Sequence, residues 1–202
     1  SQIDITSFIA HFPTIYNKCV EIGLDISKEY IPVVPVAHYL CGGIEVDTNA
    51  RTSITNLYAS GECTFTGLHG ANRLASNSLI EALAFLDSVE QVENVEFQEN
   101  IPEWNDEGTR IFNEQFLVEQ TKKELQTILS NYVGIVRSDE RLQRALNRLK
   151  LIYDESEKLY ENSKLSVAIC ELRNLRSIAY LVTKAASERK NNVGLHYNVD
   201  NV

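Results

Sequence analysis

One polar stretch, residues 62–77, carries most of the side chains that could do chemistry. It shows almost no hydrophobic periodicity and is rich in Gly, Asn, Ser and Thr, the composition expected around a ligand. Arg73 lies there among small uncharged residues, and His69 precedes it. A lone arginine is usually exposed or ion-paired, and a lone histidine such as His38 is equally unremarkable. The uncharged surroundings of Arg73 favour a binding role over a surface role.

The segments around this stretch predict how it is held. Residues 44–46 and 57–60 are candidate short strands, separated by a turn at 48–51. A helix is expected to begin at Ser78, because Ser78 and Glu81 have the spacing of a capping box ahead of an apolar run. A strand, a polar loop and then a helix N-terminus is the order that proteins use to hold an anionic or polar cofactor.

Residues 1–37 predict helical structure followed by an extended crossing segment. Apolar residues recur at helical spacing over residues 8–20, with Pro13 where a helix can begin and Gly23 where one can end. The two prolines within residues 30–37 exclude a helix there and suit an edge or crossing segment.

Residues 103–190 predict an antiparallel three-helix bundle. Three long amphipathic stretches with short connections follow an acidic linker at 90–99, and the second and third are expected to begin after Ser138 and Ser163. Trp104, where the linker ends, is predicted to be a packing anchor between this bundle and the preceding domain.

The spacing of four arginines, by four, three and four residues, would place them on one helix face: Arg137, Arg141, Arg144 and Arg148. A nucleic-acid or partner surface is one interpretation of this stripe. A solvated or ion-paired face is favoured, since Asp139 and Glu140 lie beside it and the chain as a whole is acidic.

The composition excludes several classes of protein. With 19 Lys+Arg against 28 Asp+Glu, a net charge of −9 argues against binding nucleic acid by phosphate neutralisation. No apolar run is long enough to span a membrane, and the 202 residues suggest one or two domains. The four cysteines form no C-x-x-C pair, which predicts buried reduced thiols rather than a metal site, and a cytoplasmic location. The lack of any Met suggests a piece of a longer protein.

Two long motifs resemble one family of enzymes. Residues 36–43 contain HYxCGG and residues 57–83 contain TGLHGANRLASNSL, and together they resemble the flavoproteins of the succinate dehydrogenase and fumarate reductase superfamily. The Thr-Gly before Leu68 and the Ala-Ser at 75–76 favour the L-aspartate oxidase branch. The likeness continues to residues 194–197, so it covers nearly the whole chain as the carboxy-terminal part of such an enzyme.

The resemblance implies an α+β chain: the carboxy-terminal part of an FAD-binding, Rossmann-like domain followed by the antiparallel three-helix bundle. Residues 1–37 would end a capping domain and cross over, and residues 38–95 would complete the FAD-binding domain. Residues 103–190 would form the bundle, and residues 191–202 a tail that packs back on the flavin domain.

The resemblance also implies a substrate site and a cofactor site. In the family, the residues matching His38 and Arg73 hold the carboxylates of a four-carbon dicarboxylic acid beside the flavin, with the residue matching Ser76 as a further donor. His69 is carried only as an additional candidate. Four residues are implied to bind FAD. Glu62 would use its carboxylate, Asn77 would support the turn, and Ser78 and Leu79 would use their backbone at the helix N-terminus.

The implied reaction is hydride transfer from L-aspartate to FAD, giving iminoaspartate, with oxygen or fumarate as acceptor. This reaction opens NAD biosynthesis, so quinolinate synthase is the implied partner enzyme. The chain contains no G-x-G-x-x-G after a strand, and the family's proton-transfer arginine is expected upstream. No catalytic or metal-binding residue is therefore assigned here, and we expect residues 1–202 alone to be inactive.

Two other functions fit the same residues. A flavoprotein subunit of succinate dehydrogenase or fumarate reductase would share His38, Arg73 and Glu62. A non-catalytic helical interaction module is the third interpretation, although intact His38 and Arg73 argue against it. The chain departs from the family at 191–193, where Asn-Asn-Val replaces a typical Glu-Ser-Arg, which leaves open how the tail packs.

Overall fold

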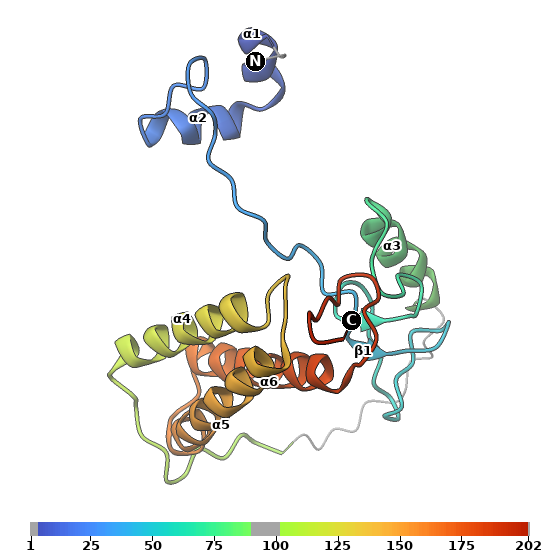
Figure 1. The fold of residues 1–202 in the computed structure, drawn as a ribbon. Coiled ribbons are helices and arrows are strands. Elements are labelled where there is room, and N and C mark those ends of the chain that lie inside the picture. The colour runs from blue at the N-terminus through green and yellow to red at the C-terminus, as the bar shows by residue number, and fades with distance from the viewer. Residues whose placement is uncertain (1–3, 90–101, 202) are drawn as a thin grey trace. The chain divides into compact units, whose positions relative to one another are not determined.

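A computed structural model describes residues 4–89 and 102–201 (Figure 1). The predicted acidic linker at 90–99 lies outside the described residues. The chain divides into two compact units, Ser1–His38 and Tyr39–Val202.

The first unit contains two short helices, α1 (Ile5–His11) and α2 (Pro13–Glu21). The side chain of Asp4 caps α1 by accepting a hydrogen bond from the Ser7 N–H at 2.9 Å. The predicted start at Pro13 is confirmed, since proline lacks the N–H that a first-turn residue would leave unpaired. Residues 30–37 adopt neither helix nor strand, as their prolines predict.

The second unit begins with a sheet of two parallel strands, β1 (Ile44–Glu45) and β2 (Thr64–Phe65). Ile44 pairs with Thr64 and Glu45 with Phe65. A Cβ at Gly43 would lie 2.3 Å from the backbone oxygen of Cys63, so only glycine allows this close approach.

The strand predicted at 57–60 is wrong. Two backbone hydrogen bonds fold this segment back on the preceding turn, from Leu57 N–H to Ile54 at 3.1 Å and from Ala59 N–H to Ala50 at 3.0 Å. The strand lies instead at 64–65, inside the stretch that was expected to have no regular structure. The turn predicted at 48–51 is present.

Helix α3 (Asn77–Val89) follows the polar loop and begins one residue before the predicted position. Three longer helices come next: α4 (Gln115–Tyr132), α5 (Asp139–Asn162) and α6 (Val167–Glu188). Each of these three contacts the other two (Figure 1). Their shared core consists of aliphatic side chains, among them Val118, Leu125, Ile128, Leu142, Leu149, Ile152, Ile169 and Leu172.

Serine caps set two of these helix starts. Ser138 begins α5 as predicted, and its hydroxyl accepts a hydrogen bond from the Arg141 N–H at 3.2 Å. The predicted start of the third helix after Ser163 is wrong, because α6 begins at Val167 with Ser166 as its cap. Ser163 is held in an isolated bridge with Arg110, which keeps its backbone extended.

Trp104 is not a packing anchor, because 71% of its surface is exposed. The segment before α4 is attached by the packing of Phe112 on the helix core and by polar contacts. Lys164 pairs with Asp106 at 2.9 Å, and Arg110 exchanges backbone hydrogen bonds with Asn162 and Lys164.

The cysteines are all free, but the prediction that they are buried holds for Cys19 alone. Cys41 and Cys170 are half-buried, and Cys63 is exposed. Cys63 lies directly before β2.

The tail after α6 is fixed to the helices by polar contacts. The amide of Asn192 makes two hydrogen bonds to the backbone of Asn198, at 2.8 and 2.9 Å. The buried amide of Asn198 donates to Asp139 at 2.8 Å, at the start of α5. Asn192 lies in the segment that departs from the family pattern, so these bonds show how this version of the tail is held.

The same tail reaches the polar loop that carries Arg73. The Leu195 N–H donates to the backbone oxygen of Ala71 at 3.2 Å. Gly194 has a φ of +59°, and a Cβ there would lie 2.4 Å from that oxygen. The close approach of tail and loop therefore requires glycine at 194.

We expect a pH-dependent loss of stability from His196 in this tail. Burial, followed by the nearby charges of Arg137 and Arg189, holds the pKa of His196 below its ordinary 6.5. Below that ordinary pKa the unfolded chain takes up a proton that the folded chain resists. The stability is therefore present at neutral pH and is lost as the pH falls through the lowered folded pKa.

Urea unfolding of the wild type and of His196→Asn at about pH 8 and about pH 5 measures this effect. The wild type should lose more stability between the two conditions than the variant does. Equal losses in the two proteins would contradict the assignment to His196.

Candidate functional site

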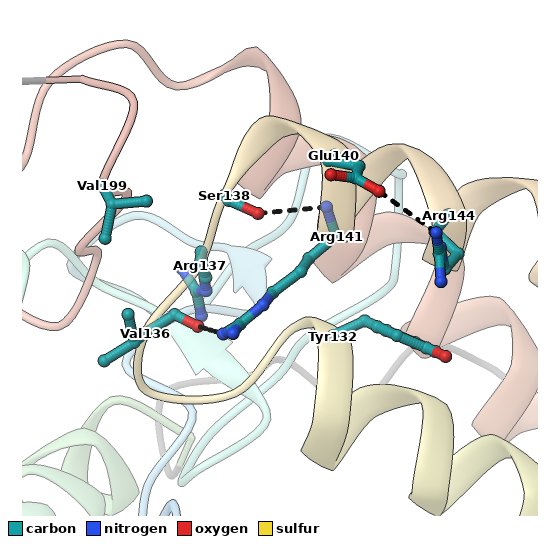
Figure 2. Close-up of a pocket in the computed structure, with 8 residues that line it drawn as sticks. All are labelled: Tyr132, Val136, Arg137, Ser138, Glu140, Arg141, Arg144 and Val199. Carbon is teal, nitrogen blue, oxygen red and sulfur yellow. Dashed lines mark hydrogen bonds and ion pairs between the residues drawn. The ribbon is translucent and has the colours of Figure 1, made fainter.

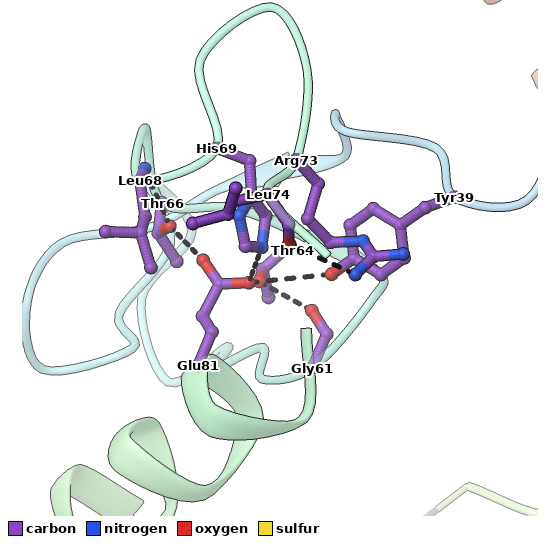
Figure 3. Close-up of polar contacts among 9 residues, drawn as sticks. All are labelled: Tyr39, Gly61, Thr64, Thr66, Leu68, His69, Arg73, Leu74 and Glu81. Carbon is purple, nitrogen blue, oxygen red and sulfur yellow. Dashed lines mark hydrogen bonds and ion pairs between the residues drawn. The ribbon is translucent and has the colours of Figure 1, made fainter. Parts of the chain in front are cut away.

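A buried carboxylate, Glu81, organises the loop before α3 (Figure 3). His69 Nε2 lies 2.6 Å from Glu81 Oε2, and the two side chains expose only 9% and 3% of their surfaces. The Thr66 hydroxyl donates to the other carboxylate oxygen, Glu81 Oε1. The Thr66 hydroxyl also accepts from the Leu68 N–H at 3.2 Å. These contacts fold the 66–69 segment back onto the first turns of α3.

The predicted capping role of Glu81 is therefore wrong. A capping-box glutamate reaches back to the backbone of its helix start. The carboxylate of Glu81 instead contacts the side chains of Thr66, His69 and Tyr39 (Figure 3). The reason is burial, because a carboxylate that is only 4% exposed needs several donors, and the loop provides them.

Tyr39 connects this network to Arg73. The guanidinium carbon of Arg73 lies 4.8 Å from the centre of the Tyr39 ring, in cation–π contact. The Tyr39 ring meets the His69 ring edge-on at 5.3 Å, and its hydroxyl lies 3.5 Å from Glu81 Oε2. Burial and then the charges of Glu81 and Glu62 raise the pKa of Tyr39, while Arg73 lowers it. The phenol is therefore a neutral donor at physiological pH.

Arg73 has hydrogen-bonding capacity left over. One terminal nitrogen donates to the Leu74 carbonyl at 3.3 Å, and the buried Nε has no hydrogen-bond partner among the described residues. A buried N–H without an acceptor costs free energy, so a bound carboxylate that accepted from it would be stabilised. The geometry suits a half-buried anion-binding arginine.

The other predicted substrate residues lie in different settings. His38 is exposed and is the last residue of the first unit, whereas Arg73 belongs to the second, so their meeting around one ligand stays a prediction. Ser76 is exposed and has a φ of +69°, a conformation that L residues rarely adopt. This strained turn directly precedes α3.

The predicted cofactor residues surround the start of α3. Asn77 and Ser78 are half-buried in its first turn, Leu79 is 68% exposed beside them, and Glu62 is exposed in the loop before β2. The first N–H groups of a helix have no partner within it, and the N-terminus carries partial positive charge. These donors suit the electron-rich edge of a flavin, so the residues present fit FAD.

Sequence reasoning missed Tyr39 and misassigned Glu81. The signal for Tyr39 was its position next to His38 in the HYxCGG motif. The signal for Glu81 was a single acid among Leu79, Ile80 and Leu83, since an isolated charge in an apolar helix needs partners.

Two family models match the chain. Residues 1–79 match an FAD binding domain, and residues 122–201 match the fumarate reductase flavoprotein C-term family. Solved structures agree with these matches. A quinol-fumarate reductase with menaquinol superposes with a TM-score of 0.74 at 26% identity, over 98% of this chain and 38% of that one. Mycobacterium smegmatis Sdh1 in complex with UQ1 superposes with a TM-score of 0.71 at 28% identity, over 98% of this chain and 36% of that one.

The two family matches identify the chain as part of an FAD-binding flavoprotein, and its fold is similar to that of the succinate dehydrogenase and fumarate reductase flavoproteins. In sequence, the chain is similar to L-aspartate oxidases. It is 43% identical over 196 residues to that of Pseudomonas aeruginosa, covering 95% of this chain and 36% of the relative. It is 44% identical over 195 residues to that of Acinetobacter baylyi, covering 94% and 36%.

The chain thus spans little more than a third of the length of these relatives. No helix within residues 4–89 and 102–201 is both long and apolar enough to cross a bilayer.

Proposed function

We propose that the complete protein is an FAD-dependent L-aspartate oxidase that converts L-aspartate to iminoaspartate, with oxygen or fumarate as acceptor. The observation that carries the proposal is Arg73, held over the Tyr39 ring with its buried Nε unpaired. The similarity to enzymes named L-aspartate oxidase over about 95% of the chain supports it.

A dicarboxylate is the substrate class that this arginine suits. The planar guanidinium donates two parallel charge-assisted hydrogen bonds to one carboxylate and stays charged at any physiological pH. We assign the second set of donors to His38 and Ser76. Tyr39 and Glu81 hold Arg73 and its loop in place and do not themselves contact the substrate in this proposal.

We propose Glu62, Asn77, Ser78 and Leu79 as the FAD ligands contributed by this chain. When bound, FAD would supply the hydride acceptor. The N-terminus of α3 would stabilise negative charge at the edge of the cofactor, and Glu62 would accept hydrogen bonds from a hydroxyl. No acid or base catalyst is assigned within these residues.

The wider assignments belong to the same proposal. The end of a capping domain would lie at residues 1–37, and the end of the flavin domain at 38–95. An antiparallel three-helix bundle would follow at 103–190, and a tail that packs on the flavin domain at 191–202. The product would enter NAD biosynthesis through quinolinate synthase. We propose a cytoplasmic location, although relatives from tobacco and rice are named chloroplastic.

The test is substrate-dependent turnover of the complete, FAD-loaded protein. L-aspartate should bleach the flavin absorbance without oxygen and should yield hydrogen peroxide with it. Succinate oxidation coupled to a quinone, with no reaction toward L-aspartate, would overturn the proposal in favour of a succinate dehydrogenase-like subunit. Turnover of neither substrate by a protein that retains FAD would favour the non-catalytic interpretation.

A further inference from the structure

A cavity of about 450 Å³ lies between the end of α4, the start of α5 and the tail (Figure 2). It is remote in sequence from the loop that carries Arg73. Its lining combines three arginines with one acid, two side chains that carry hydroxyl groups and two valines: Tyr132, Val136, Arg137, Ser138, Glu140, Arg141, Arg144 and Val199.

The positive charge of this cavity is only partly compensated. Arg144 pairs with Glu140 at 3.1 Å. Arg141 donates instead to the backbone oxygen of Val136 at 3.0 Å, and Arg137 to that of Val133 at 3.1 Å. Among the described residues no carboxylate pairs with Arg137 or Arg141, so the cavity keeps an excess of positive charge in a chain of net charge −9.

The charge of Arg137 is unfavourable for folding, because the side chain is half-buried without an opposite charge among the described residues. Its other guanidinium contact is to the ring of His196 at 2.8 Å, and burial lowers its pKa. His196 cannot neutralise a guanidinium, because a histidine that accepts from arginine must itself be neutral. A buried charge without an opposite charge destabilises the fold, and a bound anion would offset that cost.

We propose that this cavity is a binding site for a small anion with phosphate or carboxylate groups, held mainly by Arg141 and Arg144. Both side chains line the cavity, and among the described residues each guanidinium makes a single hydrogen bond, so donors remain on both. Arginine binds both kinds of group through paired hydrogen bonds. The volume suits a ligand of a few to some tens of atoms. Glu140 and the acidic balance of the chain disfavour a nucleic acid.

This anion site is independent of the proposed oxidase activity, since none of its residues belongs to the loop of Arg73. The predicted solvated or ion-paired face is confirmed for Arg141, Arg144 and Arg148, which are exposed, with Arg144 paired to Glu140; Arg137 is the half-buried exception. Arg148, the next arginine along the helix, lies 5.9 Å from the Tyr132 ring and extends the positive surface beyond the cavity.

Calorimetric titration of the complete, FAD-loaded protein tests the proposal, with pyrophosphate and citrate as probes. The double variant R141Q/R144Q removes the proposed donors, and the single variant R144Q removes one donor whose partner, Glu140, is exposed. Lys150→Gln is the matched control, because it removes one positive charge from an exposed position of the same helix.

We expect at least one probe to bind, and the double variant to bind it about tenfold more weakly or worse, with R144Q in between. Lys150→Gln should bind as the wild type does. Absence of binding by both probes would overturn the proposal, and so would equal weakening in R144Q and Lys150→Gln. Tighter binding of an RNA oligonucleotide than of either probe, lost in the same variants, would replace the small-anion site with a nucleic-acid surface.

Discussion

Replacing Arg73 by glutamine in the complete protein is expected to lower kcat/KM for L-aspartate by about 10²- to 10³-fold. The amide keeps much of the side-chain length but loses both the charge and the paired donors, and truncating one partner of a buried charge pair costs about 2–5 kcal/mol. The kcat/KM of Arg73→Lys should lie between those of Arg73→Gln and the wild type, because lysine keeps the charge without the planar pair of donors.

Steady-state kinetics with a measured flavin content separates this effect from loss of cofactor. The control is Arg51→Gln, an exposed arginine in the turn that follows β1. It should leave kcat/KM within about twofold of the wild type, as exposed substitutions usually do. An Arg73→Gln enzyme as active as the Arg51→Gln enzyme would remove Arg73 from the substrate site.

Replacing Glu81 by alanine is expected to destabilise the protein by about 2–4 kcal/mol. The change leaves the buried side chain of His69 without its acceptor and releases the hydroxyl of Thr66. It also removes the negative charge nearest the Tyr39 hydroxyl, whose ring supports Arg73. We therefore expect a rise in KM for L-aspartate alongside the lower stability.

Urea unfolding of the flavin-loaded protein measures the stability change. Asp87→Ala is the matched control, because Asp87 is an exposed acid on the same helix. Glu81→Gln keeps the size and one acceptor oxygen, so it should lose less stability than Glu81→Ala. If Glu81→Ala and Asp87→Ala were equally stable, the network around Glu81 would contribute little to folding.

The long helices could be predicted from sequence because their apolar periodicity persists over several turns. Pro13 and Ser138 also marked helix starts correctly, since both act through local backbone chemistry. Ser163 and Ser166 carry the same local signal, and only the pairing of Arg110 with the 162–164 segment selects Ser166. That pairing joins residues about fifty positions apart, beyond the reach of local patterns.

The sheet and the site were predicted less completely. A two-residue strand such as β2 has no periodicity to detect, and its pairing with β1 depends on the close approach at Gly43. Arg73 stood out because its loop is otherwise uncharged. The partners of Glu81 could not be predicted. A glutamate three residues after a serine is already explained locally as part of a capping box, so its position in the sequence does not indicate more distant partners.

The contact of Gly194 and Leu195 with Ala71 ties the far end of the chain to a loop two residues from Arg73. Versions of the protein that lack Gly194 and Leu195, or antibodies that bind these residues, would therefore disturb the loop of Arg73 from a distance. A binding defect in a version shortened in this way should therefore first be traced to the lost contact with Ala71.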